Sequence, residues 1–180
     1  MFPFNEDVRV VEHASVVVHR RPQAVFRFIG EQFFANYPRW SSEVQELKQI
    51  SPGPVRVGTR ARQVRIDLGH RSESVFAVTV FEPGRRIGFE GVSSPYRCDY
   101  LIEEAASYGS ATLLSFTFEL KQLELYLRPF AGLIHRAILD GVGRTVGTLK
   151  FLVEAEDDPP QRMRAPAATA IGKAGPVMQA

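Results

Sequence analysis

The hydrophobic pattern of this chain changes from strand spacing to helical spacing near Glu119, and no other feature constrains the fold as strongly. Between Val44 and Glu119, short runs rich in Val, Ile, Phe and Tyr are separated by turn residues such as Pro, Gly and Ser. Such runs, joined by short connections, predict an antiparallel meander of about six strands. After Glu119 the apolar residues recur at helical spacing, which predicts one long C-terminal helix. An apolar helix stripe needs a partner, so we expect this helix to pack on the apolar face of the sheet.

The predicted C-terminal helix carries an apolar stripe along about 30 residues. Pro129 removes one amide hydrogen bond and can bend the helix near its start. Four glycines in the interior, each costing about 1 kcal/mol relative to alanine, are Gly132, Gly141, Gly143 and Gly147. Two explanations stay open for them, close approach of a ligand to the backbone and tight packing of the helix on the sheet. The stripe itself consists of Leu123, Leu127, Phe130, Ile134, Ile138, Val142, Thr145, Leu149 and Leu152.

The first part of the chain adds one strand and two short helices to this arrangement. β-branched residues predict a strand over Val10–His19. Proline suits the first turn of a helix, and apolar residues at helical spacing predict a helix over Pro22–Ile29. A second helical segment covers Phe33–Tyr37, and Pro38 is expected to end it.

One domain at residues 10–155 accounts for most of the chain, with an irregular lead-in at 1–9 and a mobile Pro-, Ala- and Gly-rich tail at 156–180. With 44% apolar residues in 180, the domain can bury one sizeable core. The 22 basic and 20 acidic residues are scattered, so nucleic acid is not an expected partner. Cys98 is the one cysteine, which favours a reducing, cytoplasmic setting. Apolar stretches fall far short of the roughly 20 residues that span a bilayer, so we expect no membrane span.

Period-two alternation assigns the strand side chains to the two faces of the predicted sheet. Charged residues such as Glu73, Arg97 and Glu119 fall on the outer face. The sheet therefore presents one apolar wall toward the helix. This inner face receives Ser74, Phe76, Val78, Val80, Tyr96, Cys98, Tyr100, Ile102, Leu114, Phe116 and Phe118.

Four parts of the sequence carry a resemblance to a known superfamily: Ser15–Phe26, Tyr37–Trp40 with Val44 after it, Gly58–Thr59 and Phe81–Phe89. Together they resemble the START and Bet v 1-like (SRPBCC) superfamily and are most similar to its polyketide cyclase/dehydrase-like branch. The resemblance implies an α+β helix-grip fold, in which a curved seven-stranded antiparallel sheet wraps around a long C-terminal helix with two short helices. The superfamily includes lipid carriers, hormone receptors and ring cyclases, so it specifies the fold better than the chemistry.

A strongly bent sheet that clasps one helix leaves a gap unless large side chains fill it, and small ligands bind in such gaps. We therefore expect a hydrophobic or aromatic small molecule, lipid- or polyketide-like, in a cavity between the sheet and the C-terminal helix. Tyr37, Trp40 and His70 are placed near the mouth of this cavity. The other predicted ligand-binding residues are Ser74, Phe76, Phe89, Tyr96, Cys98, Tyr100, Phe116, Phe118, Phe130, Ile134 and Ile138.

Several polar residues near this cavity allow more than one interpretation. Tyr96 and Tyr100 could point at one polar atom of a ligand, Tyr100 could act as a general acid, or both could fill space. An inward Arg62 could anchor an acidic head group, or it could be a solvated strand charge. Cys98 is expected to be inert packing, and His135 could face either the cavity or the solvent.

The sequence contains no Gly-x-Ser-x-Gly elbow, Walker loop or His-Glu-x-x-His pattern. The glycines from Gly141 to Gly147 have the wrong spacing for a dinucleotide fingerprint, and they belong to a predicted helix rather than to the turn after a strand. The four histidines show no ligand spacing among themselves. We therefore expect neither a metal nor a cofactor.

The sequence leaves three functions open. We favour binding of an apolar small molecule, because the inner face supplies tyrosines but no committed carboxylate or histidine. The first alternative is a cyclase or dehydratase that acts on a polyketide-like substrate, with Tyr96 and Tyr100 as catalytic candidates. The second is a protein-interaction module of the chaperone- or quinone-associated kind, which needs an exposed apolar patch. Assembly into a homodimer also stays open.

Overall fold

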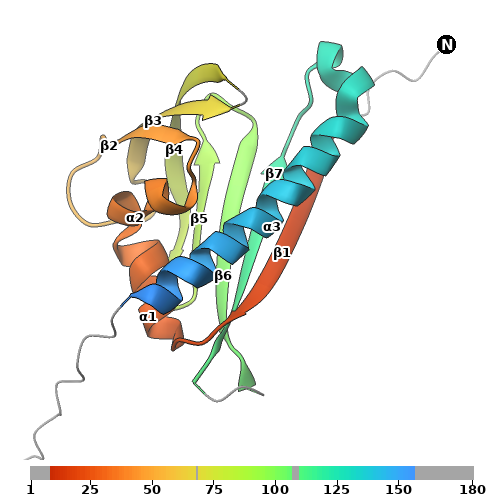
Figure 1. The fold of residues 1–180 in the computed structure, drawn as a ribbon. Helices are drawn as coiled ribbons and strands as arrows, with labels where there is room; N and C mark the ends of the chain where they lie inside the picture. The colour runs from red at the N-terminus through yellow and green to blue at the C-terminus, as the bar shows by residue number, and fades with distance from the viewer. Residues whose placement is uncertain (1–8, 68, 107–109, 157–180) are drawn as a thin grey trace, which may run out of the picture.

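The computed structural model describes residues 9–67, 69–106 and 110–156. In this part of the chain one curved antiparallel sheet faces a long helix, and two short helices lie beside it (Figure 1). This is the α+β helix-grip arrangement that the sequence predicts. The predictions for the lead-in up to residue 8 and for the tail from residue 157 onward lie outside the described residues.

All seven strands form one sheet in the order β1-β7-β6-β5-β4-β3-β2, so β2 to β7 form a meander and β1 pairs with β7. Every pairing is antiparallel, which confirms the predicted topology. The strands are β1 (Val10–Val18), β2 (Val44–Gln49), β3 (Arg60–Asp67), β4 (His70–Glu82), β5 (Arg86–Gly91), β6 (Tyr96–Glu104) and β7 (Thr112–Leu120).

The long strand β4 changes its facing at an irregularity between Val78 and Val80. Before it, Val78 is opposite Phe89 of β5, and after it Phe81 is opposite Ile87. Phe81 is consequently the residue that packs against the core, and the prediction of Val80 on the inner face is wrong. A bulge adds one extra residue to a strand and leaves no mark in the hydrophobic pattern. An assignment by strict alternation therefore places every side chain after the bulge on the wrong face.

The connection between β1 and β2 contains α1 (Pro22–Phe26), a π-helical turn (Arg27–Glu31) and α2 (Phe33–Trp40). The turn needs glycine at Gly30, because an added Cβ would lie 2.7 Å from the ring of Phe26. The close approach lets this ring stay fully buried below the turn.

Helix α2 continues through Pro38 to Trp40, although the sequence predicted its end at Tyr37. The extra turn brings Trp40 against the inner face of the sheet, beside Phe33 and Tyr37 of the same helix. Burying these three aromatic side chains stabilises the fold by more than the one amide hydrogen bond that proline cannot make.

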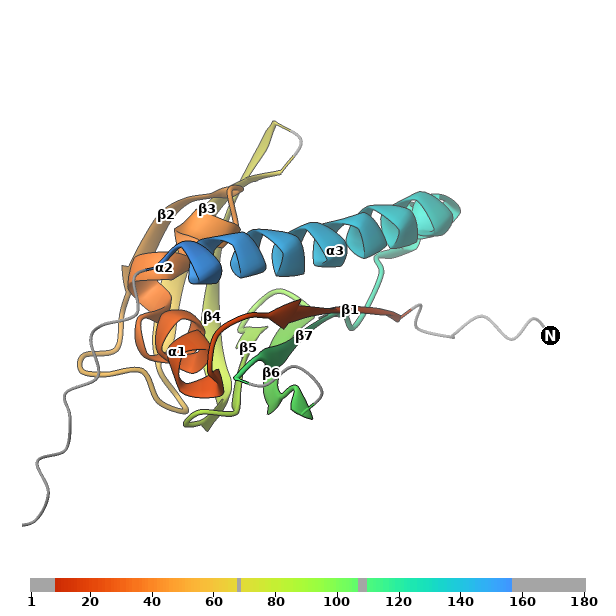
Figure 2. The ribbon, with the colours of Figure 1, turned by 60° about the horizontal axis from the view of Figure 1, so that its bottom comes forward.

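The C-terminal helix α3 spans Ala131–Ala155 and follows a 3-10 helix over Leu125–Phe130. Pro129 therefore lies in the 3-10 helix rather than at a bend inside α3. Helix α3 lies along β1 and β7 and approaches α2 toward its C-terminal end (Figure 2). Its buried residues begin near the middle of the helix and continue toward its C-terminal end: Val142, Val146, Leu149 and Val153.

The predicted apolar stripe of this helix holds only in part. Val142 and Leu149 are buried as expected, whereas Val146 and Val153 are buried without having been assigned to the stripe. Phe130 is 56% exposed. A 3-10 helix has three residues per turn, so a stripe drawn with a period of 3.6 loses its phase across this segment.

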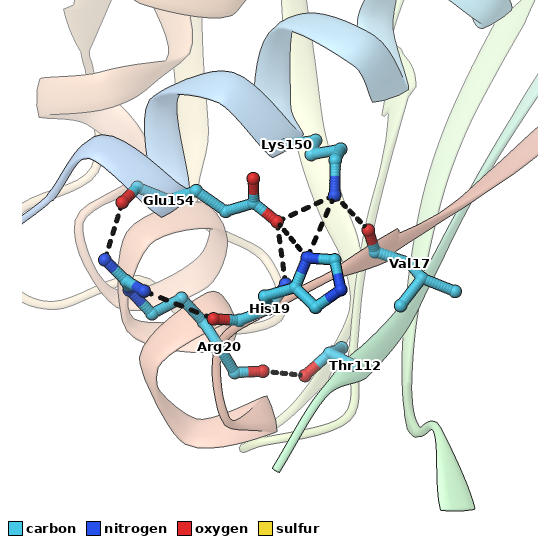
Figure 3. A network of polar contacts seen from close by, with 6 residues as sticks. All are labelled: Val17, His19, Arg20, Thr112, Lys150 and Glu154. Carbon is cyan, nitrogen blue, oxygen red and sulfur yellow. Dashed lines mark hydrogen bonds and ion pairs between the residues drawn. The ribbon is translucent and has the colours of Figure 1, made fainter. Parts of the chain in front are cut away.

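The C-terminal end of α3 is fixed to the end of β1 by a polar cluster (Figure 3). Lys150 donates from Nζ to the carbonyl of Val17 (2.6 Å) and to Glu154 Oε1 (2.7 Å). The same carboxylate oxygen accepts from the backbone N–H of His19 (2.8 Å). Arg20 donates to the backbone carbonyl of Glu154 (2.5 Å). These contacts hold the buried half of α3 in position over the strand.

The glycines of α3 fit neither explanation considered from the sequence. A Cβ added at Gly132, Gly143 or Gly147 would meet no atom within 4 Å. One added at Gly141 would meet only the guanidinium of Arg144, at 3.8 Å. Neither tight packing on the sheet nor close approach of a ligand inside the fold requires glycine at the three open positions, which are exposed.

Candidate functional site

Aromatic rings from α2 and from four strands pack into one group on the inner face, which we call the aromatic cluster. Its rings are closely spaced, with centroids 4.7 Å apart for Phe76 and Phe89 and 4.6 Å apart for Tyr100 and Phe116. No member is more than 5% exposed. The members are Phe33, Tyr37, Trp40, Phe76, Phe89, Tyr100 and Phe116.

Tyr100 is hydrogen bonded inside this cluster. Its hydroxyl accepts from Trp40 Nε1 at 3.1 Å, and burial raises the pKa of this phenol well above its ordinary value. Tyr37 and Trp40, which were expected at a cavity mouth, are instead core residues. Helix α2 packs both rings on the sheet, and its extension through Pro38 accounts for the position of Trp40.

Three polar side chains meet on the inner face: Gln63 of β3, Ser74 of β4 and Tyr96 of β6. We call them the polar trio. Gln63 donates from Nε2 to the hydroxyl of Ser74 (3.2 Å) and to the hydroxyl of Tyr96 (3.0 Å). Gln63 and Ser74 are opposite each other in the sheet, whereas Tyr96 has to reach across β5. Gly91 in β5 leaves room for this ring: an added Cβ would overlap the backbone carbonyl oxygen of Ser94 and would lie 2.7 Å from the Tyr96 ring.

Gln63 is 2% exposed, and its carbonyl oxygen Oε1 has no hydrogen-bond partner among the described residues. A buried acceptor left in this state costs about 1–3 kcal/mol, so it calls for a physical reason. Sequence reasoning missed this residue. The available signal was alternation, which places Gln63 with Ala61 on the inner face and Arg62 on the other.

The polar trio lies at an end of the inner face that is incompletely covered, which we call the Tyr96 end. Tyr96 and Phe118 stack with centroids 6.2 Å apart, yet both side chains are only half-buried. On α3, Ile134 and Ile138 are also half-buried, and Ile138 packs against the core. The Tyr96 end is thus the accessible part of an otherwise closed aromatic wall.

Protonation states at the site follow from burial. Burial raises the pKa of the Tyr96 phenol far above its ordinary value, so the hydroxyl keeps its proton and can donate it. Burial also raises the pKa of the Cys98 thiol to about 12, which agrees with an unreactive, packed side chain. The two tyrosines do not share a target, because Tyr96 pairs with Gln63 while Tyr100 pairs with Trp40.

Strand β3 does not turn Arg62 inward. Arg62 lies on the outer face, where its Nε donates to Glu73 at 2.5 Å. An anchoring role for an inward Arg62 is therefore wrong, and the alternative of a solvated strand charge holds. Arg65 shares the inner face with Gln63, and it pairs with Asp67 at 3.1 Å. The guanidinium of Arg65 is thus already neutralised by a carboxylate of its own strand.

Three of the residues considered from sequence lie apart from the polar trio. His70 is exposed at the start of β4, beside the β3–β4 turn. Phe130 is exposed before the start of α3. His135 is exposed on α3 and pairs through Nε2 with Glu12 of β1, so it faces solvent at the rim of the helix rather than a cavity.

Exposed apolar side chains gather where the 3-10 helix meets α3. Leu125 is 74% exposed and Tyr126 is 70% exposed, and Phe130 and Leu133 extend this surface into the first turn of α3. The protein-interaction hypothesis needs a surface of this kind. It is separate from the polar trio, whose members face the core.

Within the described ranges, no group of three or more His, Cys, Asp or Glu side chains could hold a metal ion. Hydroxyls and an amide make up the polar trio, and these groups suit hydrogen bonding to a ligand better than tight binding of a transition metal. None of the helices in the part of the chain described here is long and apolar enough to cross a membrane.

The curved sheet, the long helix and the aromatic inner wall define a helix-grip domain of the START type. Residues 9–154 match the model of the family described as polyketide cyclase / dehydrase and lipid transport. The protein belongs to this family, as the sequence resemblance predicted. A comparison with curated proteins found no significant match.

Solved structures share the fold at low sequence identity. The Zhui aromatase/cyclase from Streptomyces sp. R1128 has a TM-score of 0.67 and 10% identity, over 82% of this chain and 94% of that chain. A START superfamily protein from Mycobacterium smegmatis has a TM-score of 0.64 and 14% identity, over 80% and 97%. The di-domain ARO/CYC BexL from the BE-7585A biosynthetic pathway has a TM-score of 0.61 and 18% identity, over 80% and 46%. These likenesses establish a common fold and nothing about the ligand.

Proposed function

We propose that this protein binds an apolar or aromatic small molecule, lipid- or polyketide-like, between the inner face of the sheet and helix α3. One observation carries the proposal: the aromatic cluster is closed, while the large aromatic side chains of Tyr96 and Phe118 beside it stay half-buried. An apolar wall that the chain leaves partly uncovered gains free energy when an apolar ligand covers it.

The comparisons support the same class of ligand. The family description names polyketide cyclase, dehydrase and lipid transport, and two of the similar structures are aromatase/cyclases. Lipids and polyketides are largely apolar molecules with a few polar groups, which matches an aromatic wall that carries the polar trio.

Binding of an uncharged fluorescent probe, N-phenyl-1-naphthylamine, tests the proposal. We expect Tyr96→Ala to weaken probe binding at least about tenfold, because the variant removes half of the stacked pair that forms the accessible wall. Tyr126→Ala is the matched control, since it makes the same change at a tyrosine that is 70% exposed and far from the polar trio in sequence. Its probe affinity should equal that of the unchanged protein.

The reverse result contradicts the proposal. If Tyr126→Ala weakened binding while Tyr96→Ala did not, the probe would bind the exposed apolar surface before α3 instead. Binding of no apolar probe at all, together with native mass spectrometry that finds no co-purified small molecule, would also count against the proposed site.

A cyclase or dehydratase is the second candidate function, and Tyr96 is the observation that favours it. Its phenol is half-buried, stays protonated at neutral pH and neighbours the Ser74 hydroxyl, so it can act as a general acid toward a carbonyl oxygen. Tyr100 is a poorer candidate because its hydroxyl is buried against Trp40.

Tyr96→Phe separates catalysis from binding. If the protein is an enzyme, this variant should retain probe affinity and lose turnover of a polyketide-type substrate by about 10²-fold or more, the usual contribution of a positioned acid. Tyr100→Phe should turn over normally. Equal turnover by the unchanged protein and Tyr96→Phe would exclude the acid role.

A further inference from the structure

The side-chain amide of Gln63 is hydrogen bonded through its nitrogen but not, among the described residues, through its oxygen. Its Nε2 uses both N–H groups, one toward Ser74 and one toward Tyr96. Its Oε1 can accept two hydrogen bonds and receives none from the described residues. Because Gln63 is 2% exposed, bulk solvent does not reach this oxygen freely. The polar trio therefore contains a fixed acceptor that lacks a donor.

The two hydroxyls of the polar trio, by contrast, can still donate a hydrogen bond. Each accepts a hydrogen bond from Gln63 Nε2, so each keeps its own hydrogen available for donation. A ligand group that satisfies the trio has to donate to Gln63 Oε1 and accept from Tyr96. A hydroxyl group does both. An ether or a ketone only accepts, and it would leave the buried oxygen of Gln63 without a partner.

The rest of the ligand is constrained by the wall beside the polar trio. Tyr96 stacks on Phe118 with an interplanar angle of 9°, and both rings are half-buried. A flat aromatic framework covers such a pair of rings better than a branched aliphatic one, because ring-on-ring packing adds to the burial of apolar area. Arg65, the cation on the same strand face, is already paired with Asp67, so the site offers no unpaired charge to an acidic ligand there.

We propose that Gln63 is a specificity-determining residue, and that it selects aromatic ligands carrying a free hydroxyl group over the corresponding ethers and ketones. The inference rests on the proposed binding function. It adds the chemical class of the ligand and the residue that recognises the ligand hydroxyl group. Gln63 Oε1 accepts the ligand hydroxyl hydrogen, and the Tyr96 hydroxyl donates to the ligand oxygen.

Isothermal titration with three matched probes tests this inference on the full chain: 2-naphthol, 2-methoxynaphthalene and 2-acetonaphthone. All three present the same apolar framework and differ in their hydrogen-bonding group. We expect 2-naphthol to bind at least about tenfold more tightly than either of the others, because only the phenol pairs the buried acceptor.

Gln63→Leu and the nearly isosteric Gln63→Met should remove this preference, leaving the three affinities within about twofold, since no amide acceptor remains. Gln45→Leu is the matched control, because Gln45 is an exposed glutamine on the neighbouring strand β2. It should keep the full preference for 2-naphthol. Thermal unfolding of each variant checks that the fold is intact, and the three-probe comparison on the unchanged protein needs no variant.

The outcomes separate this inference from the proposed function. Equal binding of the three probes by the unchanged protein overturns the role of Gln63 and leaves the binding function standing. Tighter binding of 2-acetonaphthone than of 2-naphthol also overturns it. A ketone only accepts hydrogen bonds, so the Gln63 amide would then have to donate from its nitrogen to the ligand. A preference that survives Gln63→Leu assigns recognition to another residue. Binding of none of the probes overturns both proposals.

Discussion

The two ends of the inner face are built from similar residues but reach different states. At the end covered by α2, the aromatic cluster is closed, and its phenol and indole groups satisfy each other through the Trp40–Tyr100 hydrogen bond. At the Tyr96 end, a stacked aromatic pair stays half-buried, and the amide oxygen of Gln63 has no donor in the part of the chain that the structure describes. The closed end supplies stability, and the Tyr96 end has the unsatisfied surface that a binding site needs.

The cause of the difference is the distribution of helices over the sheet. Helix α2 and the buried half of α3 cover the closed end, where α3 is also fixed to β1 through Lys150 and Glu154 (Figure 3). The part of α3 before Val142 supplies no fully buried residue. Coverage by a second layer, rather than the residue types on the strands, decides which part of the inner face is closed core.

Truncating one aromatic residue at each end tests the comparison most strongly. Phe89→Ala, in the closed cluster, should lower the free energy of unfolding by about 3–5 kcal/mol, because it removes a fully buried ring and leaves a void. Phe118→Ala, at the Tyr96 end, should lower it by about 1–2 kcal/mol, because that ring is only half-buried. Urea denaturation measures both. Equal losses would show that the Tyr96 end is core as well.

Gly91 tests how the polar trio is assembled. Gly91→Ala should destabilise the protein by about 1–3 kcal/mol, because the added methyl group overlaps the backbone carbonyl oxygen of Ser94 and the Tyr96 ring that crosses β5. The displaced ring should also weaken binding of the fluorescent probe. Thermal unfolding and probe titration check the two effects. Lower stability with unchanged probe binding would mean that the methyl group displaces only the Ser94 carbonyl and that the position of the Tyr96 ring does not depend on Gly91.

On the exposed side of α3, substitution of Gly143 should stabilise the protein rather than destabilise it. Gly143→Ala should raise the free energy of unfolding by about 0.5–1 kcal/mol, since an added Cβ meets nothing and alanine has the higher helix propensity. Gly147→Ala should do the same for the same reason. Urea denaturation measures the gain. A loss of stability would reveal a contact on this face that the fold of one chain does not contain.

The dependence of stability on acid pH tests the polar contacts of Lys150 and Glu154, which fix α3 to the end of β1. Desolvation tends to raise the pKa of Glu154, but hydrogen bonds from the His19 backbone and from Lys150 outweigh it and lower the pKa to about 2. A carboxyl with a lowered pKa stabilises the fold above its ordinary value of 4.5, and this contribution disappears as the pH falls toward 2.

Glu154→Gln should therefore be less stable than the unchanged protein at pH 7, by less than about 1 kcal/mol because the side chain is partly exposed. The difference should shrink between pH 4.5 and pH 2 and vanish below that range. Urea denaturation across this pH range provides the measurement. A difference that stays constant down to pH 2 would mean that Glu154 acts through packing rather than through its charge.

Sequence reasoning identified most of the wall but not Gln63, the residue that we propose selects the ligand. Tyr96, Ser74 and Phe118 lie on the inner face as alternation placed them. Tyr37 and Trp40 were expected at a mouth and lie in the core. Helix α2 packs both on the sheet, and Trp40 reaches it because Pro38 does not end that helix. Gln63 was overlooked in a strand whose arginines dominate the sequence pattern.

The sequence by itself determined the seven strands, the long helix and the apolar wall, because the period of side chains along a strand or helix is a local property of the backbone. Tertiary structure alone decided which part of that wall is covered. It also brought Gln63 to Tyr96, a residue 33 positions away, across the gap that Gly91 leaves open. Such pairings depend on how strands curve and on where a helix ends, and no local pattern records them.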